Sequence, residues 1–239
     1  MNYVWATGTH QGRIRVRNED SVFPETSGSD DGPIIVGVAD GMGGHVAGNV
    51  ASSLALAAAT EAAPDAAITT TERILAGNEA ILKRVNDDPA LAGMGTTMTL
   101  GRFDHDGTLE LSHVGDSRCY LLRGYELRQL STDHTVVAEL VALGHLKPED
   151  VATHPQRHLV TRTLGLGPVT IENVTLDLED GDRILFCSDG LTTMIDDEAI
   201  QDLLAAGDDP EATAWHLIEA ANTSGGIDNI TVAIVDARP

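Results

Sequence analysis

Short runs in which apolar and polar residues alternate occur along most of the chain, and this period of two predicts β-strands. Turn signals such as HDG at 105–107 and EDGD at 179–182 separate the runs. The predicted strands occupy residues 3–8, 34–39, 96–103, 109–114, 118–124, 125–130, 170–178, 183–188 and 230–237.

Four segments have the composition or spacing of helices. Residues 51–67 are rich in alanine, and we expect a helix of small residues that Pro64 ends. Residues 196–207, with acids at the start that suit the helix dipole, and residues 210–224 predict two more. A fourth helix is predicted at 69–87, where one apolar stripe contains Ile74, Leu75, Ile81, Leu82 and Val85.

The predicted strands and helices come in groups and do not alternate steadily as in a βαβ chain. Such grouping favours antiparallel sheets with helices packed on their outer faces, which is an α+β layered fold. Neither an internal repeat nor a low-complexity linker divides the 239 residues. We therefore expect one domain spanning residues 1–239.

The chain has 37 acidic and 15 basic residues and a formal net charge of −22. Nucleic acids and anionic membranes bind cationic faces, so neither is expected as a partner. The acidic excess fits a cytoplasmic protein and one that gathers divalent cations. Cys119 and Cys187 lie in apolar runs without CxxC spacing, which predicts two buried, reduced thiols. No signal peptide is evident, and no run has the roughly 18 apolar residues that span a bilayer.

Five segments place acidic residues at a predicted strand end or turn. Singly, each has a structural explanation, because Asp-Gly and Asp-Asn form turns and Ser-Asp begins helices. Jointly, they suit a hard divalent cation, which takes carboxylate oxygens from several segments. Two like charges about 4 Å apart repel by about 4 kcal/mol at an effective dielectric of 20, so convergence would imply bound metal. The acids are Glu19, Asp20, Asp40, Asp116, Asp189 and Asp228.

Seven motifs resemble those of the PPM family of metal-dependent protein serine/threonine phosphatases, the type 2C group. They occur in the family's order between residues 12 and 235, so the resemblance covers nearly the whole chain. It is strongest to the compact bacterial members that oppose Ser/Thr kinases. The motifs are RVRNED, VADGMGGH, GMGTTMT, VGDSRCYLLR, HPQRHLVTRTLG, LFCSDGL and GIDNITV.

The resemblance implies a sandwich of two antiparallel sheets flanked by helical pairs (α-β-β-α), with two Mn²⁺ or Mg²⁺ ions at one end. Asp40 is then expected to bridge both ions, and the Gly41 carbonyl to bind one of them. Asp189 and Asp228 are expected to bind the other ion.

The same resemblance assigns further residues to the site. Glu19 would act mainly through metal-bound waters, with Asp20 in the same shell. Asp116, together with Asp189, resembles the site of a third ion in bacterial members. Arg15 matches the family's phosphate-binding arginine, and its planar guanidinium suits a phosphate.

The activity implied is hydrolysis of phosphoserine and phosphothreonine by a hydroxide that bridges two metals, without a phosphoenzyme. The catalytic residues would be Asp40, Asp189 and Arg15. Arg13 and Arg17 alternate in phase with Arg15, and we interpret both as solvated strand residues.

Animal members carry a histidine general acid directly after the Asp-Gly pair, where this chain has Met42. His45 is a candidate general acid, with helix capping, a surface role or proton donation by a metal-bound water as the alternatives. Residues 144–165 resemble the family's flap, in which Thr153 or His154 could approach the third ion or the substrate.

Three other histidines fit no closed zinc pattern, and we expect them at the surface. They are His134, His145 and His158.

The expected partners are phosphorylated proteins, namely Ser/Thr kinases and their substrates, and the chain is expected to be a monomer. One alternative is a phosphatase of a phosphorylated anti-sigma antagonist, although such proteins usually carry sensory domains that this chain lacks. A catalytically silent metal-binding regulatory module should have lost ligand acids, and a calcium-binding structural domain would not need Arg15.

Overall fold

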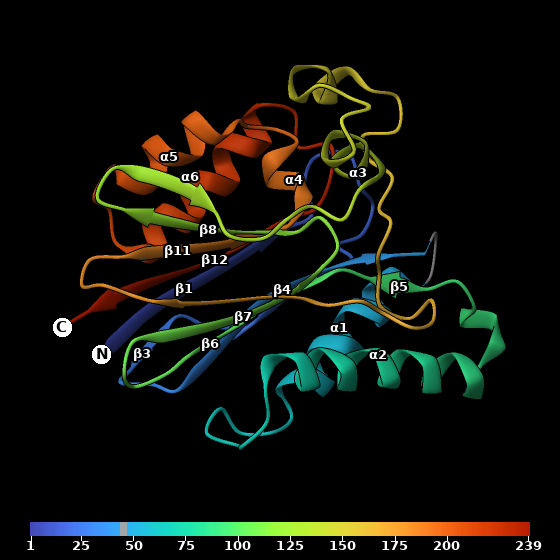
Figure 1. Cartoon of the computed structure of the whole chain (residues 1–239), viewed down its shortest axis with the longest axis horizontal. Helices are drawn as coiled ribbons and strands as arrows, with labels where there is room; N and C mark the ends of the chain where they lie inside the picture. The colour runs from blue at the N-terminus through green and yellow to red at the C-terminus, as the bar shows by residue number, and fades with distance from the viewer. Residues whose placement is uncertain (44–46) are drawn as a thin grey trace.

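The computed structural model of the chain describes residues 1–43 and 47–239. Its strands form two antiparallel six-stranded sheets, which lie face to face (Figure 1). The first has the order β3-β1-β12-β11-β8-β9. These strands are β1 (Asn2–His10), β3 (Gly28–Asp30), β8 (Arg118–Arg123), β9 (Glu126–Gln129), β11 (Arg183–Cys187) and β12 (Ile230–Arg238).

The second sheet has the order β10-β7-β6-β4-β2, with the short β5 paired to β4. Its strands are β2 (Asp20–Phe23), β4 (Ile34–Met42), β5 (Gly95–Thr96), β6 (Met98–Phe103), β7 (Thr108–Val114) and β10 (Glu172–Asp177). In the first sheet, β1 and β12 pair along their full length, from Asn2 opposite Arg238 to His10 opposite Ile230. The first and last strands of the chain therefore lie side by side.

Apolar side chains from both sheets form the central core. The rings of Tyr3 and Phe103 meet edge to face with centroids 5.3 Å apart, and those of Phe103 and Phe186 with centroids 6.2 Å apart. Aliphatic residues such as Val36 and Val235 fill the space around them. Alternate side chains of each strand point to the inner face of its sheet. The apolar residues at every second position of the sequence therefore form this core.

Helices cover the outer face of each sheet. The second sheet is covered by α1 (Gly48–Thr60) and α2 (Thr70–Asp87), which share a core cluster with it. The first is covered by α4 (Asp189–Thr192), α5 (Asp197–Ala205) and α6 (Pro210–Thr223). The remaining elements are η1 (Pro89–Leu91), α3 (Val136–Ala142) and η2 (Pro148–Thr153), and α3 and η2 lie in the segment beyond β9 (Figure 1).

All nine predicted strands are present, and both cysteines are buried. Residues 96–103 divide into β5 and β6, and the sequence pattern missed β2 and β3 because each is too short for alternation to be visible. The four predicted helices correspond to α1, α2, α5 and α6, whereas the short α3 and α4 were not predicted.

Two details of the predicted helices are wrong. The first helix ends at Thr60, before Pro64. The guanidinium of the buried Arg73 donates hydrogen bonds to three carbonyls of residues 59–63 at 2.6–3.2 Å and so holds the end of α1. The apolar stripe on α2 is also narrower than predicted, since Leu75 and Leu82 are 39% and 37% exposed.

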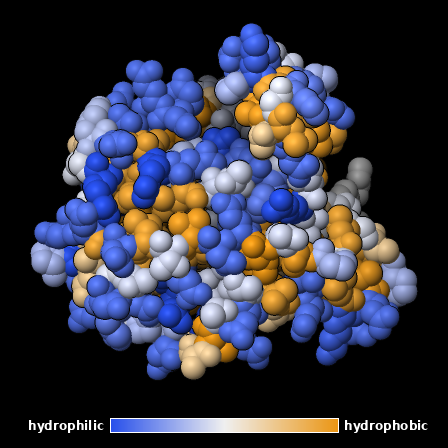
Figure 2. All heavy atoms as spheres, in the orientation of Figure 1, coloured by the Kyte–Doolittle hydropathy of each residue, from blue (hydrophilic) through white to orange (hydrophobic). Residues whose placement is uncertain are grey.

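The face seen in Figure 2 is covered largely by hydrophilic side chains, in line with the acidic composition. Hydrophobic areas interrupt it in several places, and one of them lies over the α3 segment (Figure 2). Leu143, directly after α3, and Leu159 are both exposed. Among the described residues, no helix is both long and apolar enough to cross a membrane.

Candidate active site

The six acidic residues singled out in the sequence lie together at one end of the two sheets. Asp20, the first residue of β2, is the pairing partner of Asp40 near the end of β4. The Gly41 N–H donates to the Glu19 carbonyl at 3.1 Å. The RVRNED and VADGMGGH motifs are therefore neighbours because their strands pair.

Asp40 and Asp116 are connected through two buried hydroxyl groups. The Asp40 N–H donates to Thr97 Oγ1, and the Thr97 N–H donates to the Asp40 carbonyl, both at 2.9 Å. Thr97 Oγ1 in turn shares a 2.7 Å hydrogen bond with Ser117 Oγ. The turn that carries Asp116 is thus fixed beside the end of β4.

Asp189 and Asp228 are brought together by Gly190. A Cβ atom on Gly190 would lie 1.9 Å from the Asn229 carbonyl oxygen, so only glycine permits this approach. The neighbouring Ser188 Oγ donates to Asp20 Oδ2 at 2.8 Å, which ties the first sheet to the second.

The start of α1 packs equally closely against the site. A Cβ atom on Gly41 would lie 2.1 Å from the Gly48 carbonyl oxygen, and one on Gly48 would lie 2.8 Å from the Glu19 Cδ atom. These two glycines let Glu19 approach the end of β4 and the first turn of α1. The loop between them contains residues 44–46, and the candidate general acid His45 therefore lies outside the described residues.

Burial and mutual repulsion shift the proton affinities of the acids. Burial raises the pKa of Asp40 well above its usual range, and the charges of Asp20 and Asp189 add to this rise. The pKa of Asp189 is also raised, by burial and then by Asp228. Neighbouring carboxylates with raised pKa values are more stable when they bind protons or cations than when they remain as unpaired negative charges.

Asp20 and Asp116 show the same effect. Burial raises the pKa of Asp20 to about 7, although hydrogen bonds from Thr231 and Ser188 oppose the rise. Burial, followed by the charges of Asp189 and Asp133, raises the pKa of Asp116 to about 8.

This donor set fits a hard divalent cation. Asp20 Oδ1 is buried and has no hydrogen-bond partner among the described residues, which is costly for a carboxylate oxygen. Oxygen ligands converging from several segments are what Mg²⁺, Mn²⁺ and Ca²⁺ prefer. A bound cation would satisfy that oxygen and offset the repulsion between the acids.

Arg15 lies beside the acids, but not on a strand. Residues 11–19 form an irregular loop, so the interpretation of Arg13 and Arg17 as strand residues is wrong, although both are exposed as expected. Arg15 Nη2 lies 2.5 Å from Asp228 Oδ2. Partial burial alone would lower the pKa of Arg15, but the hydrogen bond and charge of Asp228 raise it.

Asn229 holds this loop in place, a role that could not be predicted from the sequence. Its side chain accepts a hydrogen bond from the Glu19 N–H at 2.8 Å and donates to the Gln11 and Arg17 carbonyls at 2.9 Å. Arg15 and Glu19 are therefore positioned by the residue that follows Asp228. An Asn after an Asp is such a common turn pair that the motif alone could not reveal this function.

Thr153 and His154, in the predicted flap, make only local hydrogen bonds within the described chain. Thr153 Oγ1 donates to the Asp150 carbonyl at 3.2 Å, and His154 Nδ1 accepts from the Gln156 N–H at 3.2 Å. His158, expected only as a surface residue, is exposed but also close enough for its charge to lower the pKa of Asp189.

His134 is buried, contrary to the expectation that it lies at the surface. It stacks on His113 with ring centroids 4.8 Å apart, and Glu172 lies beside the pair. His134 Nδ1 accepts the Gly115 N–H at 3.1 Å, and His113 Nε2 lies 3.0 Å from the Gly115 carbonyl. Burial lowers the pKa of His113 to about 4 and also lowers that of His134. The hydrogen bonds of the two rings support the turn before Asp116.

The comparisons with known proteins agree with this geometry. Residues 30–238 match the family model described as Stage II sporulation protein E (SpoIIE). Over 237 residues the chain is 41% identical to the serine/threonine protein phosphatase PstP of Mycobacterium tuberculosis, covering 97% of this chain and 44% of that protein. It is 37% identical to the serine/threonine phosphatase stp of Listeria monocytogenes, covering 95% of this chain and 93% of that one. The chain belongs to the PPM family of protein serine/threonine phosphatases.

A solved PPM structure extends the similarity to three dimensions. The catalytic domain of PstP, in complex with two manganese ions, superposes with a TM-score of 0.88 at 37% identity and full coverage of both chains. The predicted α-β-β-α fold is therefore confirmed. This PPM chain spans less than half the length of the curated mycobacterial relative.

Proposed function

We propose that this chain hydrolyses phosphoserine and phosphothreonine in proteins and so reverses the action of Ser/Thr kinases. The observation that carries the proposal is the convergence of acids from five segments beside Arg15. Buried carboxylates with raised pKa values provide a cation site, and an adjacent guanidinium provides a phosphate site.

The acids divide into three groups in this proposal. Asp40, the Gly41 carbonyl, Asp189 and Asp228 would hold two ions, and Asp116 with Asp189 would hold a third. Glu19 and Asp20 would orient water around them. When bound, Mn²⁺ or Mg²⁺ lowers the pKa of a water molecule that attacks phosphorus and offsets the charge of the phosphate.

Arg15 would bind two non-bridging phosphate oxygens. Its present partner is Asp228, which is also a proposed ligand. Cation binding at Asp228 would weaken this ion pair, and the guanidinium would then be available to the substrate. Its exposed position in the 11–19 loop leaves room for a phosphate to reach it.

The leaving oxygen needs a proton, and the Met42 side chain has none to give. His45 remains our candidate general acid. Residues 144–165 would form a flap over the site, with Thr153 and His154 meeting the substrate or the third ion.

At the level of the whole chain, we propose one catalytic domain over residues 1–239 that acts as a monomer in the cytoplasm. Its partners would be phosphorylated proteins, including Ser/Thr kinases and their substrates. The complete set of acids argues against a catalytically silent module, and Arg15 beside them argues against a structural calcium site.

The test is the rate of phosphate release from a phosphothreonine peptide with Mn²⁺ and after chelation with EDTA. We expect turnover only with metal, and a loss of at least about a hundredfold in Asp189→Asn. Asp177→Asn, an exposed acid on β10, is the matched control and should keep full activity. Equal rates with and without EDTA would rule the proposal out.

A further inference from the structure

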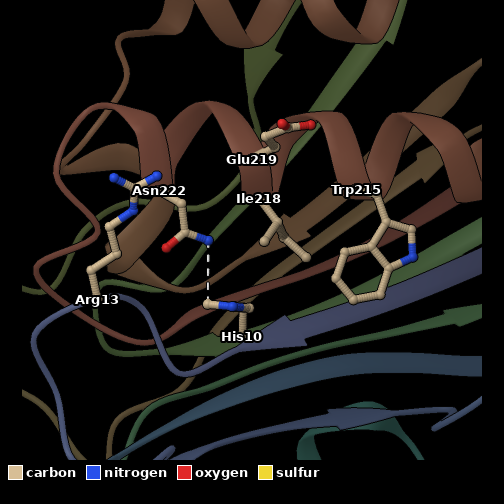
Figure 3. Close-up of a pocket in the computed structure, with 6 residues that line it drawn as sticks. All are labelled: His10, Arg13, Trp215, Ile218, Glu219 and Asn222. Carbon is tan, nitrogen blue, oxygen red and sulfur yellow. Dashed lines mark hydrogen bonds between the residues drawn. The ribbon is translucent and has the colours of Figure 1, made fainter.

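A pocket lies between the end of β1 and helix α6, next to the acidic site. It has a volume of about 360 Å³, within the range of side-chain and ligand pockets. Figure 3 shows the α6 side chains above the end of β1, with Arg13 at one end of the pocket and Trp215 at the other. Its lining residues are His10, Arg13, Trp215, Ile218, Glu219 and Asn222.

One end of this pocket is apolar. Trp215 is 48% exposed, although an indole ring of this size is usually covered. Ile218, one turn further along α6, is only 2% exposed and forms the floor. A partly exposed tryptophan beside a buried aliphatic floor is typical of the residues that anchor protein contacts.

The other end is polar and incompletely satisfied. Asn222 Nδ2 lies 3.2 Å from His10 Nδ1, which also accepts the Gly12 N–H at 2.9 Å (Figure 3). Asn222 is only 8% exposed, yet its Oδ1 has no hydrogen-bond partner among the described residues. The exposed guanidinium of Arg13 lies beside it and is a donor for an incoming anionic or carbonyl group.

The pocket is continuous with the proposed active site. The Arg13 N–H donates to the Gly226 carbonyl at 2.7 Å. Arg15 lies two residues after Arg13, and Asp228 lies two residues after Gly226. Arg15 and Asp228 form the ion pair of the site. Apolar side chains are also exposed among the arginines at this junction, since Ile14, Val16 and Ile227 are 69%, 92% and 47% exposed.

We propose that this pocket binds an apolar side chain of the phosphoprotein substrate, from the same extended segment that presents the phosphorylated residue. The inference rests on the proposed phosphatase function and adds a specificity site to it. Arg15 then binds the phosphate, Arg13 lies between the phosphate and the pocket, and Trp215 and Ile218 receive the apolar side chain. Because the chain has a net charge of −22, it does not attract an anionic substrate from a distance. An apolar contact needs no such long-range attraction.

The lengths of the two segments between Arg15 and Trp215 set an approximate position for the apolar residue. Arg13 and Arg15 are separated by at most about 7 Å of extended backbone, and Asn222 and Trp215 by about 10 Å along α6. An extended peptide covers the combined distance in about five residues. The apolar side chain is therefore expected about five residues before or after the phosphorylated one.

The test uses phosphothreonine peptides that carry leucine about five residues before or after the phosphothreonine, and matched peptides with glycine there. With Mn²⁺, we expect roughly tenfold higher kcat/KM for leucine at one of the two positions, through a lower KM. Trp215→Ala should remove this preference. His216→Ala, an exposed neighbour on the same helix, should keep it. Trp215→Glu, which places a charge in the pocket, is the second variant and should act like Trp215→Ala.

Hydrolysis of p-nitrophenyl phosphate separates this inference from the proposed function, because that substrate has no peptide to dock. It should proceed equally in the wild type and in both Trp215 variants. No leucine preference at either position, or a preference that survives both Trp215 substitutions, would overturn the pocket assignment. Self-association that depends on Trp215, without any effect on peptides, would instead make the pocket a contact between copies. Failure of p-nitrophenyl phosphate hydrolysis itself would count against the phosphatase.

Discussion

Burial raises the pKa of Asp40, and the charges of acids from four other segments of the chain add to this rise. The acids themselves could be predicted from the sequence, because each follows an apolar run at a turn. The residues that position them could not. Ser188, Thr97 and Asn229 have side chains that are common in turns and strands, and only the fold shows what they hold.

Arg15→Ala should mainly weaken phosphate binding. A hydrogen bond between charged groups contributes about 1.5–3 kcal/mol, so KM should rise roughly tenfold or more while kcat changes much less. Arg17→Ala removes an equally exposed arginine from the same loop and should leave KM within about twofold. Steady-state kinetics on a phosphothreonine peptide provide both values, and an unchanged KM in Arg15→Ala would exclude it from the phosphate site.

At the scale of elements, the strands were predictable because alternation over five or more residues is a strong signal. The 11–19 loop could not be predicted, because its alternating arginines resemble the pattern of a strand. Hydrogen bonds to Asn229 and Gly226 hold its backbone in an irregular conformation. The short α4 was hidden for a related reason. Its four residues are too few for helical periodicity, and its Gly190 lies against the Asn229 carbonyl, a contact that only the fold reveals.

Gly190→Ala tests this close approach. The new Cβ atom would overlap the Asn229 carbonyl oxygen, and relieving the overlap must move Asp189 relative to Asp228. We expect a loss of about 3 kcal/mol in the free energy of unfolding, together with loss of metal binding. Chemical denaturation measures the first and calorimetric titration with Mn²⁺ the second.

Gly8→Ala is the control for this substitution. Its Cβ atom would overlap the far end of the Ile218 side chain, Cδ1 at 2.7 Å, and make an ordinary contact with Val232 Cγ2 at 3.9 Å, so the cost should be about 1 kcal/mol. Normal stability and Mn²⁺ binding in Gly190→Ala would show that the glycine is not what brings the two acids together.

For the whole molecule, the clustered acids predict an unusual dependence of stability on pH. In the metal-free protein the folded-state pKa values of Asp20 and Asp116 are raised to about 7 and about 8, above those of the unfolded chain. The folded state therefore binds more protons than the unfolded state between pH 4 and 8, and stability must fall as pH rises through this range.

Mn²⁺ should reverse this loss, because the ion binds the deprotonated acids only in the folded state. At a hundredfold excess over Kd, one ion adds about 2.7 kcal/mol. Thermal unfolding in EDTA and in Mn²⁺ at several pH values tests the account, and the rise in Tm caused by Mn²⁺ should grow with pH. A metal-free Tm that rises steadily from pH 4 to pH 8 would contradict the assignment of these pKa values.

Acids from separate segments form one cation site around Asp40 in the proposed enzyme. Calorimetric titration with Mn²⁺ tests it most directly, on the wild type, on Asp40→Asn and on the exposed control Asp177→Asn. We expect at least two ions bound per chain in the wild type and in Asp177→Asn, and loss of this binding in Asp40→Asn. Wild-type stoichiometry and affinity in Asp40→Asn would contradict it.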